Sequence, residues 1–266
     1  MAKIVIVTGA SAGIGSVCCD RLAHKGWTVY GASRRGTASG PWTPLTMDVD
    51  IDQDVASGVA RVLEEQGRVD AVIACAGWGL AGPVENTPIA EAMAQLDTNF
   101  WGAVRIVQAV LPAMRKQGGG RVVLVSSLGG VIALPFQAFY SASKFAMEGY
   151  GEALAYEVAP FGIHVTLVEP GNIKTEFTQS RRDVAPPAGV DPYEVASKKA
   201  IAVMERDEKS GAPSETVADV VERILEDKRP PRRASVGKMD ERIGLLAKKL
   251  LPYRFFSWAA KSSLGV

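Results

Sequence analysis

Histidine and cysteine, two residue types that commonly bind metals, are scarce in this chain. Its 266 residues include only His24 and His164, with Cys18, Cys19 and Cys75. Their spacing matches neither a zinc site nor the disulfide framework of a small secreted domain. We therefore expect no metal ion, and we predict a reducing, cytoplasmic environment.

The sequence also lacks long apolar runs and an excess of charge of one sign. No run approaches the roughly 20 apolar residues that span a bilayer, and the N-terminus lacks the features of a secretory signal. The net charge of +1 gives no electrostatic reason to expect a nucleic acid as partner. The apolar share of 47% is large enough to fill a substantial core.

Short β-branched runs alternate with amphipathic stretches along most of the chain. This alternation predicts an α/β fold with a doubly wound parallel sheet, Rossmann-like and three-layered, in a single domain over residues 1–266. The expected strands are residues 4–7, 28–32, 71–74, 121–126, 164–168 and 234–237. The expected helices are residues 13–25, 52–66, 89–116 (with a possible break), 140–159 and 214–227.

Two segments interrupt this regular pattern near the end of the chain. Residues 175–215 begin with a stretch rich in charge and proline, which predicts a mobile, substrate-binding loop insertion. Residues 238–266 form a basic amphipathic tail. The tail could cap a substrate pocket, pack on a neighbouring subunit or touch a membrane surface. Packing is the favoured alternative, because aromatic side chains at helical spacing usually become buried.

A glycine-rich loop connects the first expected strand to the first expected helix. Gly9, Gly13 and Gly15 lie in the segment T-G-A-S-A-G-I-G, together with Ser11 and Ile14. Glycines at such a turn let the backbone approach a pyrophosphate, and the N-terminus of the helix supplies N–H donors to the phosphates. The loop predicts a dinucleotide-binding site.

The end of the second strand indicates which dinucleotide binds. A site that prefers NAD usually has a carboxylate here for the ribose hydroxyls, but this chain has Ser33 followed by Arg34 and Arg35. A guanidinium group can grip a 2′-phosphate with two hydrogen bonds. We therefore predict NADP as the cofactor, with NAD as the less favoured alternative.

From Ile4 to about Thr175 the chain resembles the short-chain dehydrogenase/reductase family. The resemblance rests on seven segments in order: T-G-A-S-A-G-I-G at 8–15, D-V at 48–49, A-C-A-G at 74–77, Asn99, V-S-S at 125–127, Y-S-A-S-K at 140–144 and P-G-N-I-K-T at 170–175. One departure is Ala74–Cys75, where the family usually has two asparagines that brace the loop.

The resemblance implies a role for residues in each of these segments. It implies Asp48 and Val49 at the adenine ring, Ala76 and Gly77 against the cofactor, and Pro170, Gly171, Ile173 and Thr175 around the nicotinamide. It further implies a catalytic tetrad of Asn99, Ser127, Tyr140 and Lys144, in which Tyr140 and Lys144 also contact the cofactor. Family members commonly pair through their long helices, so we expect a homodimer or homotetramer.

Tyr140 and Lys144 lie one helical turn apart, which suits proton transfer to a carbonyl oxygen. A phenol ordinarily titrates near 10, and a neighbouring ammonium favours the phenolate. Lowering that pKa by about three units requires roughly 4 kcal/mol. We expect Lys144 and the oxidised nicotinamide to supply this stabilisation, and Ser127 to orient the substrate oxygen.

An apolar set of side chains near these motifs is expected to bind substrate: Trp78, Leu128, Val131, Phe136, Phe139 and Phe177. Such a wall favours an apolar alcohol or carbonyl compound. Residues 140–165 are similar to the hydroxysteroid and retinol dehydrogenase branch, which implies a steroid, a retinoid or another apolar ketone or aldehyde. Alternatives are a ketoreductase of acyl thioesters, a sugar or polyol dehydrogenase, and a catalytically silent NADP-sensing regulator.

Overall fold

Short runs of valine and isoleucine form the strands of a parallel sheet in the computed structural model, which describes residues 2–264. The strand order is β11-β7-β6-β4-β1-β2-β3, which is the order of a doubly wound fold. The strands are β1 (Ile4–Thr8), β2 (Thr28–Ser33), β3 (Thr43–Thr46), β4 (Ala71–Ala74), β6 (Gly120–Val125), β7 (Ile163–Pro170) and β11 (Arg233–Val236).

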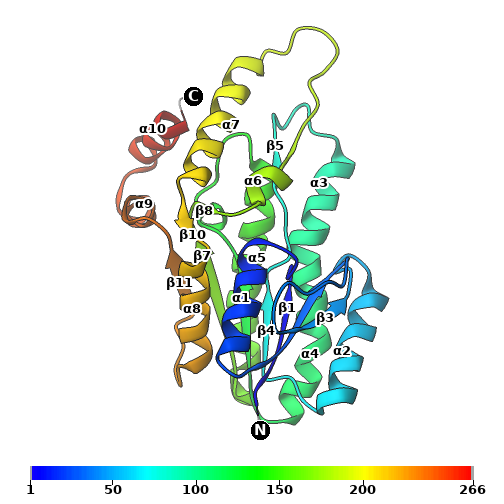
Figure 1. The fold of residues 1–266 in the computed structure, drawn as a ribbon. Coiled ribbons are helices and arrows are strands. Elements are labelled where there is room, and N and C mark those ends of the chain that lie inside the picture. The colour runs from blue at the N-terminus through cyan, green and yellow to red at the C-terminus, as the bar shows by residue number, and fades with distance from the viewer. Residues whose placement is uncertain (1, 265–266) are drawn as a thin grey trace.

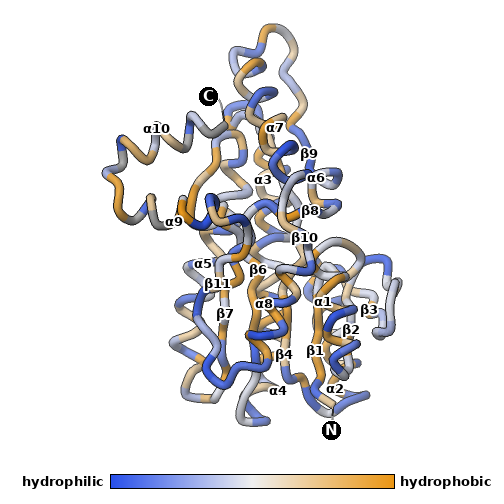
Figure 2. The backbone as a smooth tube through the Cα atoms, turned by 60° about the vertical axis from the view of Figure 1, so that its left-hand side comes forward, coloured by the Kyte–Doolittle hydropathy of each residue, from blue (hydrophilic) through white to orange (hydrophobic). Residues whose placement is uncertain are grey.

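Helices cover both faces of this sheet, as Figure 1 shows. One face packs against α1 (Gly13–His24) and α8 (Glu215–Glu226), and the other against α2 (Asp52–Gln66), α4 (Gly102–Lys116) and α5 (Ala138–Val158). Alternate residues of β1 point to opposite faces of the sheet. Val5 and Val7 pack on the face covered by α1 and α8, and Ile4 and Ile6 pack on the face covered by α2, α4 and α5. Figure 2 shows β1 as an apolar segment between helices of mixed hydropathy. The predicted doubly wound α/β fold is confirmed.

The long helix expected over residues 89–116 is continuous, and its possible break takes the form of a π-helical turn. It consists of α3 (Ile89–Leu96), a π-helical turn over Asp97–Trp101, and α4. π-helical turns often mark functional sites, and Asn99 lies at the centre of this one with a fully buried side chain.

Several elements of the structure were not predicted from the sequence. Strand β3 contains Pro44 and only four residues, so it lacked a strand signal; proline is tolerated there because β3 is an edge strand. Helix α7 (Glu194–Lys209) lies within the predicted insertion 175–215. The same insertion holds α6 (Phe177–Ser180), and its ends pair as β8 (Ile173–Lys174) with β10 (Ala212–Pro213). A further pair joins β5 (Leu80–Ala81) to β9 (Arg182–Asp183).

The predicted tail 238–266 contains α9 (Met239–Leu250) and α10 (Tyr253–Leu264), while Gly265 and Val266 lie outside the described residues. Helix α10 packs beside α7 at one end of the molecule (Figure 1). Within residues 2–264, no helix combines the length and apolar character that crossing a membrane requires.

Candidate active site

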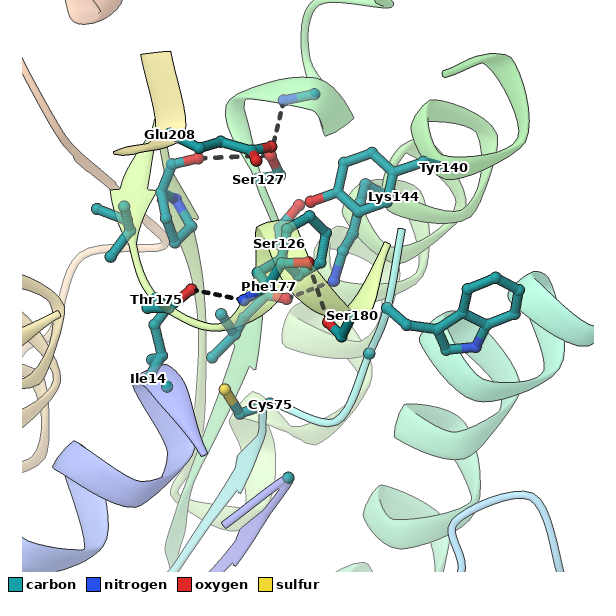
Figure 3. Close-up of a pocket in the computed structure, with 18 of the residues that line it drawn as sticks. Ile14, Cys75, Ser126, Ser127, Tyr140, Lys144, Thr175, Phe177, Ser180 and Glu208 are labelled. Atoms are coloured by element: carbon teal, nitrogen blue, oxygen red, sulfur yellow. Dashed lines mark hydrogen bonds between the residues drawn. The ribbon is translucent and has the colours of Figure 1, made fainter. Parts of the chain in front are cut away.

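The carboxyl ends of the parallel strands open into a cavity of about 1070 Å³. Its walls come from the turns after β1, β2, β4, β6 and β7, and from α7, α9 and α10. Ligands of doubly wound folds bind at this edge, because the strand order reverses there and leaves a crevice. Figure 3 shows the part of the cavity around Tyr140 and Lys144.

The glycine loop forms one end of the cavity, and its geometry requires glycine. Gly9 has a φ of 70°, and a Cβ atom there would lie 2.9 Å from the backbone of Ala76. A Cβ atom on Gly15 would lie 2.3 Å from the carbonyl oxygen of Gly9. The loop therefore places backbone N–H groups against the cavity at a distance that side chains would prevent.

A carboxylate already lies on the anion-binding end of α1. The N–H of Gly13 donates to Oε2 of Glu176 at 3.1 Å, and the residue before the helix, Ala12, provides no capping side chain. The buried hydroxyl of Ser126 also borders the cavity without a hydrogen-bond partner. An oxyanion held at the helix N-terminus is the chemistry that a dinucleotide phosphate requires. The residues present thus fit such a cofactor.

The residues expected near the adenosine also border the cavity: Ser33, Arg34, Arg35, Asp48 and Val49. Ser33 is buried and its hydroxyl accepts a hydrogen bond from the N–H of Gly36 at 3.2 Å. Both arginines are exposed, and neither makes an ion pair or hydrogen bond with any residue in the described part of the chain. Their guanidinium groups are thus available to a ligand.

Every residue expected at the cofactor borders this single cavity. Besides those already described, the set comprises Gly9, Ser11, Gly13, Ile14, Gly15, Ala76, Gly77, Tyr140, Lys144, Pro170, Gly171, Ile173 and Thr175. The turn after β4 keeps its position without the two asparagines usual in the family. The hydroxyl of Thr8 accepts hydrogen bonds from the N–H groups of Cys75 at 3.0 Å and Ala76 at 3.1 Å.

Helix α5 directs Tyr140 and Lys144 into the cavity from one face. The Lys144 Nζ lies 6.0 Å from the centre of the Tyr140 ring and donates to the carbonyl oxygen of Val125 at 2.9 Å. Ser127 caps the short turn after β6, where its Oγ accepts from the N–H of Gly129 at 3.0 Å. The structure therefore brings Ser127, Tyr140 and Lys144 together at one wall of the cavity.

Asn99 lies behind this wall and does not border the cavity. Its Oδ1 accepts from the N–H of Trp78 at 2.9 Å, and its Nδ2 donates to the carbonyl of Trp78 and the hydroxyl of Ser143. A Cβ atom on Gly77 would lie 3.0 Å from Asn99 Oδ1 and 3.9 Å from Lys144 Nζ. Asn99 thus holds the loop that separates it from Lys144, and its place in the catalytic tetrad stays a prediction.

Burial dominates the ionisation of Tyr140 and Lys144. It raises the pKa of Tyr140 to about 12, although the nearby Ser127 hydroxyl acts in the opposite direction. Burial also lowers the pKa of Lys144 to about 8. In the cofactor-free protein the shift at Tyr140 is thus opposite to the one predicted from its spacing with Lys144, because Nζ bonds a backbone carbonyl and the phenol is desolvated. The phenol is protonated at neutral pH, as a proton donor must be.

Cys75 also borders the cavity, and burial raises the pKa of its thiol to about 11. A thiol with so high a pKa is a poor nucleophile at neutral pH. Cys75 is thus better suited to packing than to nucleophilic catalysis.

The predicted substrate residues divide into two groups. Trp78, Leu128 and Phe177 border the cavity, and the Phe177 ring packs edge-on against Tyr140 with 5.8 Å between ring centres. Val131, Phe136 and Phe139 do not border it. Phe136 has a φ of 60° and packs instead against Ala200 and Met204.

Sequence reasoning missed several residues that form the far wall of the cavity: Ile132, Gln137, Met204, Asp207, Glu208, Asp240, Glu241, Gly244, Ala247, Leu251, Phe256 and Ala259. Most of them belong to α7, α9 and α10. The amphipathic pattern of the tail was the available signal, and capping the pocket was one of its three interpretations. The structure supports that interpretation, because one face of both tail helices borders the cavity.

Comparison with known proteins agrees with this geometry. The family model for short chain dehydrogenases matches residues 3–185. The chain belongs to the short-chain dehydrogenase family. It is therefore an NAD(P)-dependent oxidoreductase, as the seven segments implied, and its Rossmann-like fold is that of a solved relative. A short-chain dehydrogenase from Streptomyces avermitilis superposes with a TM-score of 0.85 at 28% identity, over 98% of each chain.

Two curated relatives of this short-chain dehydrogenase differ in how far they align. A 3-ketodihydrosphingosine reductase from Bacteroides thetaiotaomicron is 37% identical over 97% of each chain. Human 17-beta-hydroxysteroid dehydrogenase type 1 is 38% identical over 191 residues, which are 66% of this chain and 58% of the human protein. The predicted likeness to the hydroxysteroid branch is confirmed.

Proposed function

We propose that this enzyme uses NADPH to reduce the ketone of a long-chain amphiphile, specifically a long-chain 2-amino-3-ketone of the 3-ketodihydrosphingosine type. The cavity wall that runs from the catalytic residues to the tail helices carries the proposal. Beyond Leu128 it continues through Ile132, Leu134 and Met204 to Leu251 and Phe256. This apolar wall suits an alkyl chain.

The extent of the two alignments favours an alkyl chain over a steroid. The Bacteroides reductase aligns over 97% of this chain, so most of α7, α9 and α10 has a counterpart there. The human hydroxysteroid dehydrogenase aligns over only 66%. Because α7, α9 and α10 form the far wall of the cavity, the alignment that extends over most of them is the better guide to the substrate.

Arg34 and Arg35 support NADPH as the preferred cofactor. They follow Ser33 at the end of β2 and border the cavity without protein partners in the described residues. Two unpaired guanidinium groups at this position complement a 2′-phosphate, and a serine in place of a carboxylate removes repulsion of that group.

The chain's own residues then have distinct tasks in reduction. The bound nicotinamide supplies the hydride. The hydroxyl of Ser127 holds the substrate carbonyl oxygen, and the phenol of Tyr140 donates its proton to that oxygen as negative charge develops on it. Lys144, whose buried ammonium carries a positive charge at neutral pH, stabilises the phenolate that remains and binds the ribose hydroxyls.

A substrate panel tests the proposal. Purified enzyme is mixed with NADPH and with 3-ketodihydrosphingosine, steroid ketones or retinal, and absorbance of NADPH is followed. We expect kcat/KM for the long-chain aminoketone to exceed that for the other carbonyl compounds by at least about tenfold, a difference of about 1.4 kcal/mol. A steroid or retinoid as the best substrate would refute the proposed substrate class while leaving the reductase chemistry intact.

A further inference from the structure

A buried carboxylate, Glu208, borders the cavity near the reacting groups. It lies in the last turn of α7, and only 9% of the residue is exposed. Its Oε2 accepts hydrogen bonds from the hydroxyl of Thr178 at 2.6 Å and from the guanidinium of Arg181. Its Oε1 has no hydrogen-bond partner among the described residues and remains accessible, on a residue that borders the cavity.

Pairing with Arg181 does not explain why Oε1 of Glu208 is left without a partner. A carboxylate that served only to neutralise the guanidinium would gain most from two parallel hydrogen bonds. Here only one nitrogen of Arg181 bonds to Glu208, while Nε and Nη1 are buried without partners. The side chain of Arg181 is 2% exposed, whereas Glu208 reaches the cavity. The geometry turns the free oxygen of Glu208 toward a ligand.

Glu208 lies close to the position that the substrate carbonyl must occupy. Its negative charge contributes to the raised pKa of Tyr140, after burial. It is joined through Thr178 to the segment whose Phe177 ring packs against Tyr140. Figure 3 shows Glu208 on the opposite wall of the cavity from α5, near Ser127 and Tyr140. Glu208 thus lies on a wall of the cavity that faces the reacting groups.

The surroundings of Glu208 favour a cation over an anion. Asp207 on α7, and Asp240 and Glu241 on α9, also border the cavity, and a hydrogen bond of 3.4 Å from Lys238 to Ser210 joins the two segments. Of the cationic groups nearby, Arg181 pairs with Glu208 itself, and Lys238 bonds the Ser210 hydroxyl. Arg206 pairs with Asp207, and the guanidinium of Arg182 stacks on the Trp78 ring at 4.2 Å.

We propose that Glu208 binds the ammonium group next to the ketone of the substrate, with Oε1 as the acceptor. This inference rests on the proposed function, because it assigns the polar end of the same aminoketone. The alkyl chain then extends along the apolar wall toward Leu251 and Phe256. Glu208 is a specificity-determining residue, since it fixes which side of the ketone faces the catalytic groups.

Two substrates and a matched pair of variants test this assignment. The substrates are 3-ketodihydrosphingosine and the same ketone with hydrogen in place of the amino group. The variants are Glu208→Gln and, as control, Glu205→Gln, which removes a carboxylate with 39% side-chain exposure one turn earlier on α7. A hydrogen bond to a charged group is worth about tenfold to 100-fold in binding. Glu208→Gln should lower kcat/KM by that factor for the aminoketone and by less than about threefold for the deaminated ketone. Glu205→Gln should change neither.

Glu208→Gln leaves Arg181 without its counter-charge, so its fold is checked by thermal unfolding. The double variant Arg181→Met with Glu208→Gln removes both charges and avoids that cost. It too should lose the preference for the amine while it still reduces the deaminated ketone. Retained preference in the double variant, or an equal loss for both ketones in Glu208→Gln, would overturn the assignment.

The wild-type enzyme separates failure of this inference from failure of the proposed function. If it reduces neither long-chain ketone, the proposed substrate class is wrong and the inference fails with it. If it reduces both ketones with equal kcat/KM, the long-chain substrate class stands and the role of Glu208 is refuted.

Discussion

Glu176 competes with the cofactor for the N-terminus of α1. Its Oε2 accepts a hydrogen bond from the N–H of Gly13 at 3.1 Å, at the position where the glycine loop would hold a pyrophosphate. Cofactor binding must therefore break this contact, and the carboxylate must also move away from the negative phosphates. Its removal should tighten cofactor binding.

The size of this effect follows from the exposure of Glu176. A hydrogen bond that involves a charged group contributes about 1.5–3 kcal/mol, but Glu176 is exposed and solvent screens the interaction. About 1 kcal/mol remains, which corresponds to about fivefold in a dissociation constant. Glu176→Ala should lower the Kd of NADPH by about that factor, measured by titration of NADPH fluorescence.

Glu64→Ala provides the matched control, because Glu64 is an exposed glutamate on α2 that lies outside the cavity. It should leave the Kd unchanged. The difference between the two variants should shrink as salt is added, since screening weakens the repulsion between the carboxylate and the phosphates. An unchanged or weaker affinity in Glu176→Ala would show that this carboxylate does not compete with the cofactor.

Three further predictions follow from the cavity. Arg34→Asp should shift the ratio of NADPH to NADH affinity toward NADH by about tenfold to 100-fold, because a charge-assisted hydrogen bond is lost; a wild-type preference for NADH would contradict the cofactor assignment. Gly9→Ala should destabilise the fold by about 1–2 kcal/mol in urea unfolding, because its φ of 70° and the 2.9 Å approach to Ala76 oppose a Cβ atom. In the cofactor-free enzyme the buried Lys144 has its pKa lowered to about 8, so the folded state releases this proton before the unfolded state does. Cys75 and Tyr140, whose pKa values are raised, act in the opposite direction over the same pH range, so the contribution of Lys144 is the difference between the wild type and Lys144→Met. The free energy of unfolding of the wild type relative to Lys144→Met should rise by about 3 kcal/mol between pH 8 and pH 10.5, and the variant should be the more stable of the two at pH 7. A Lys144→Met profile parallel to that of the wild type would show that the ammonium carries no burial penalty.

The cofactor half of the site was predictable from sequence because backbone geometry constrains it. Gly9 and Gly15 are required because a Cβ atom at either position would lie within 3 Å of neighbouring backbone atoms, and the motif that contains them lies at one fixed place, between β1 and α1. The same holds for Tyr140 and Lys144, which one helix places on one face. Local spacing determines such positions.

The substrate half depends on contacts between distant segments, which local patterns do not encode. Phe136 and Phe139 were chosen because they are apolar and close in sequence to Tyr140, yet Phe136 packs against α7. Glu208 carried no sequence signal, because a charged residue near the end of a helix is usually exposed. Its burial arises from Thr178 and Arg181, which lie 30 and 27 residues earlier. The sequence predicted a lowered pKa for Tyr140 for the same reason, because the spacing between Tyr140 and Lys144 does not show how deeply the phenol is buried.

The central claim is that this protein reduces a carbonyl compound and that Tyr140 supplies the proton. Tyr140→Phe removes the hydroxyl and retains the ring that packs against Phe177. We predict that kcat/KM for the long-chain aminoketone falls by about 100-fold to 10,000-fold, while the Kd of NADPH changes by less than about threefold. Undiminished turnover in Tyr140→Phe would contradict the mechanism, and NADPH binding with no turnover of any carbonyl compound by the wild type would instead identify a cofactor-sensing protein.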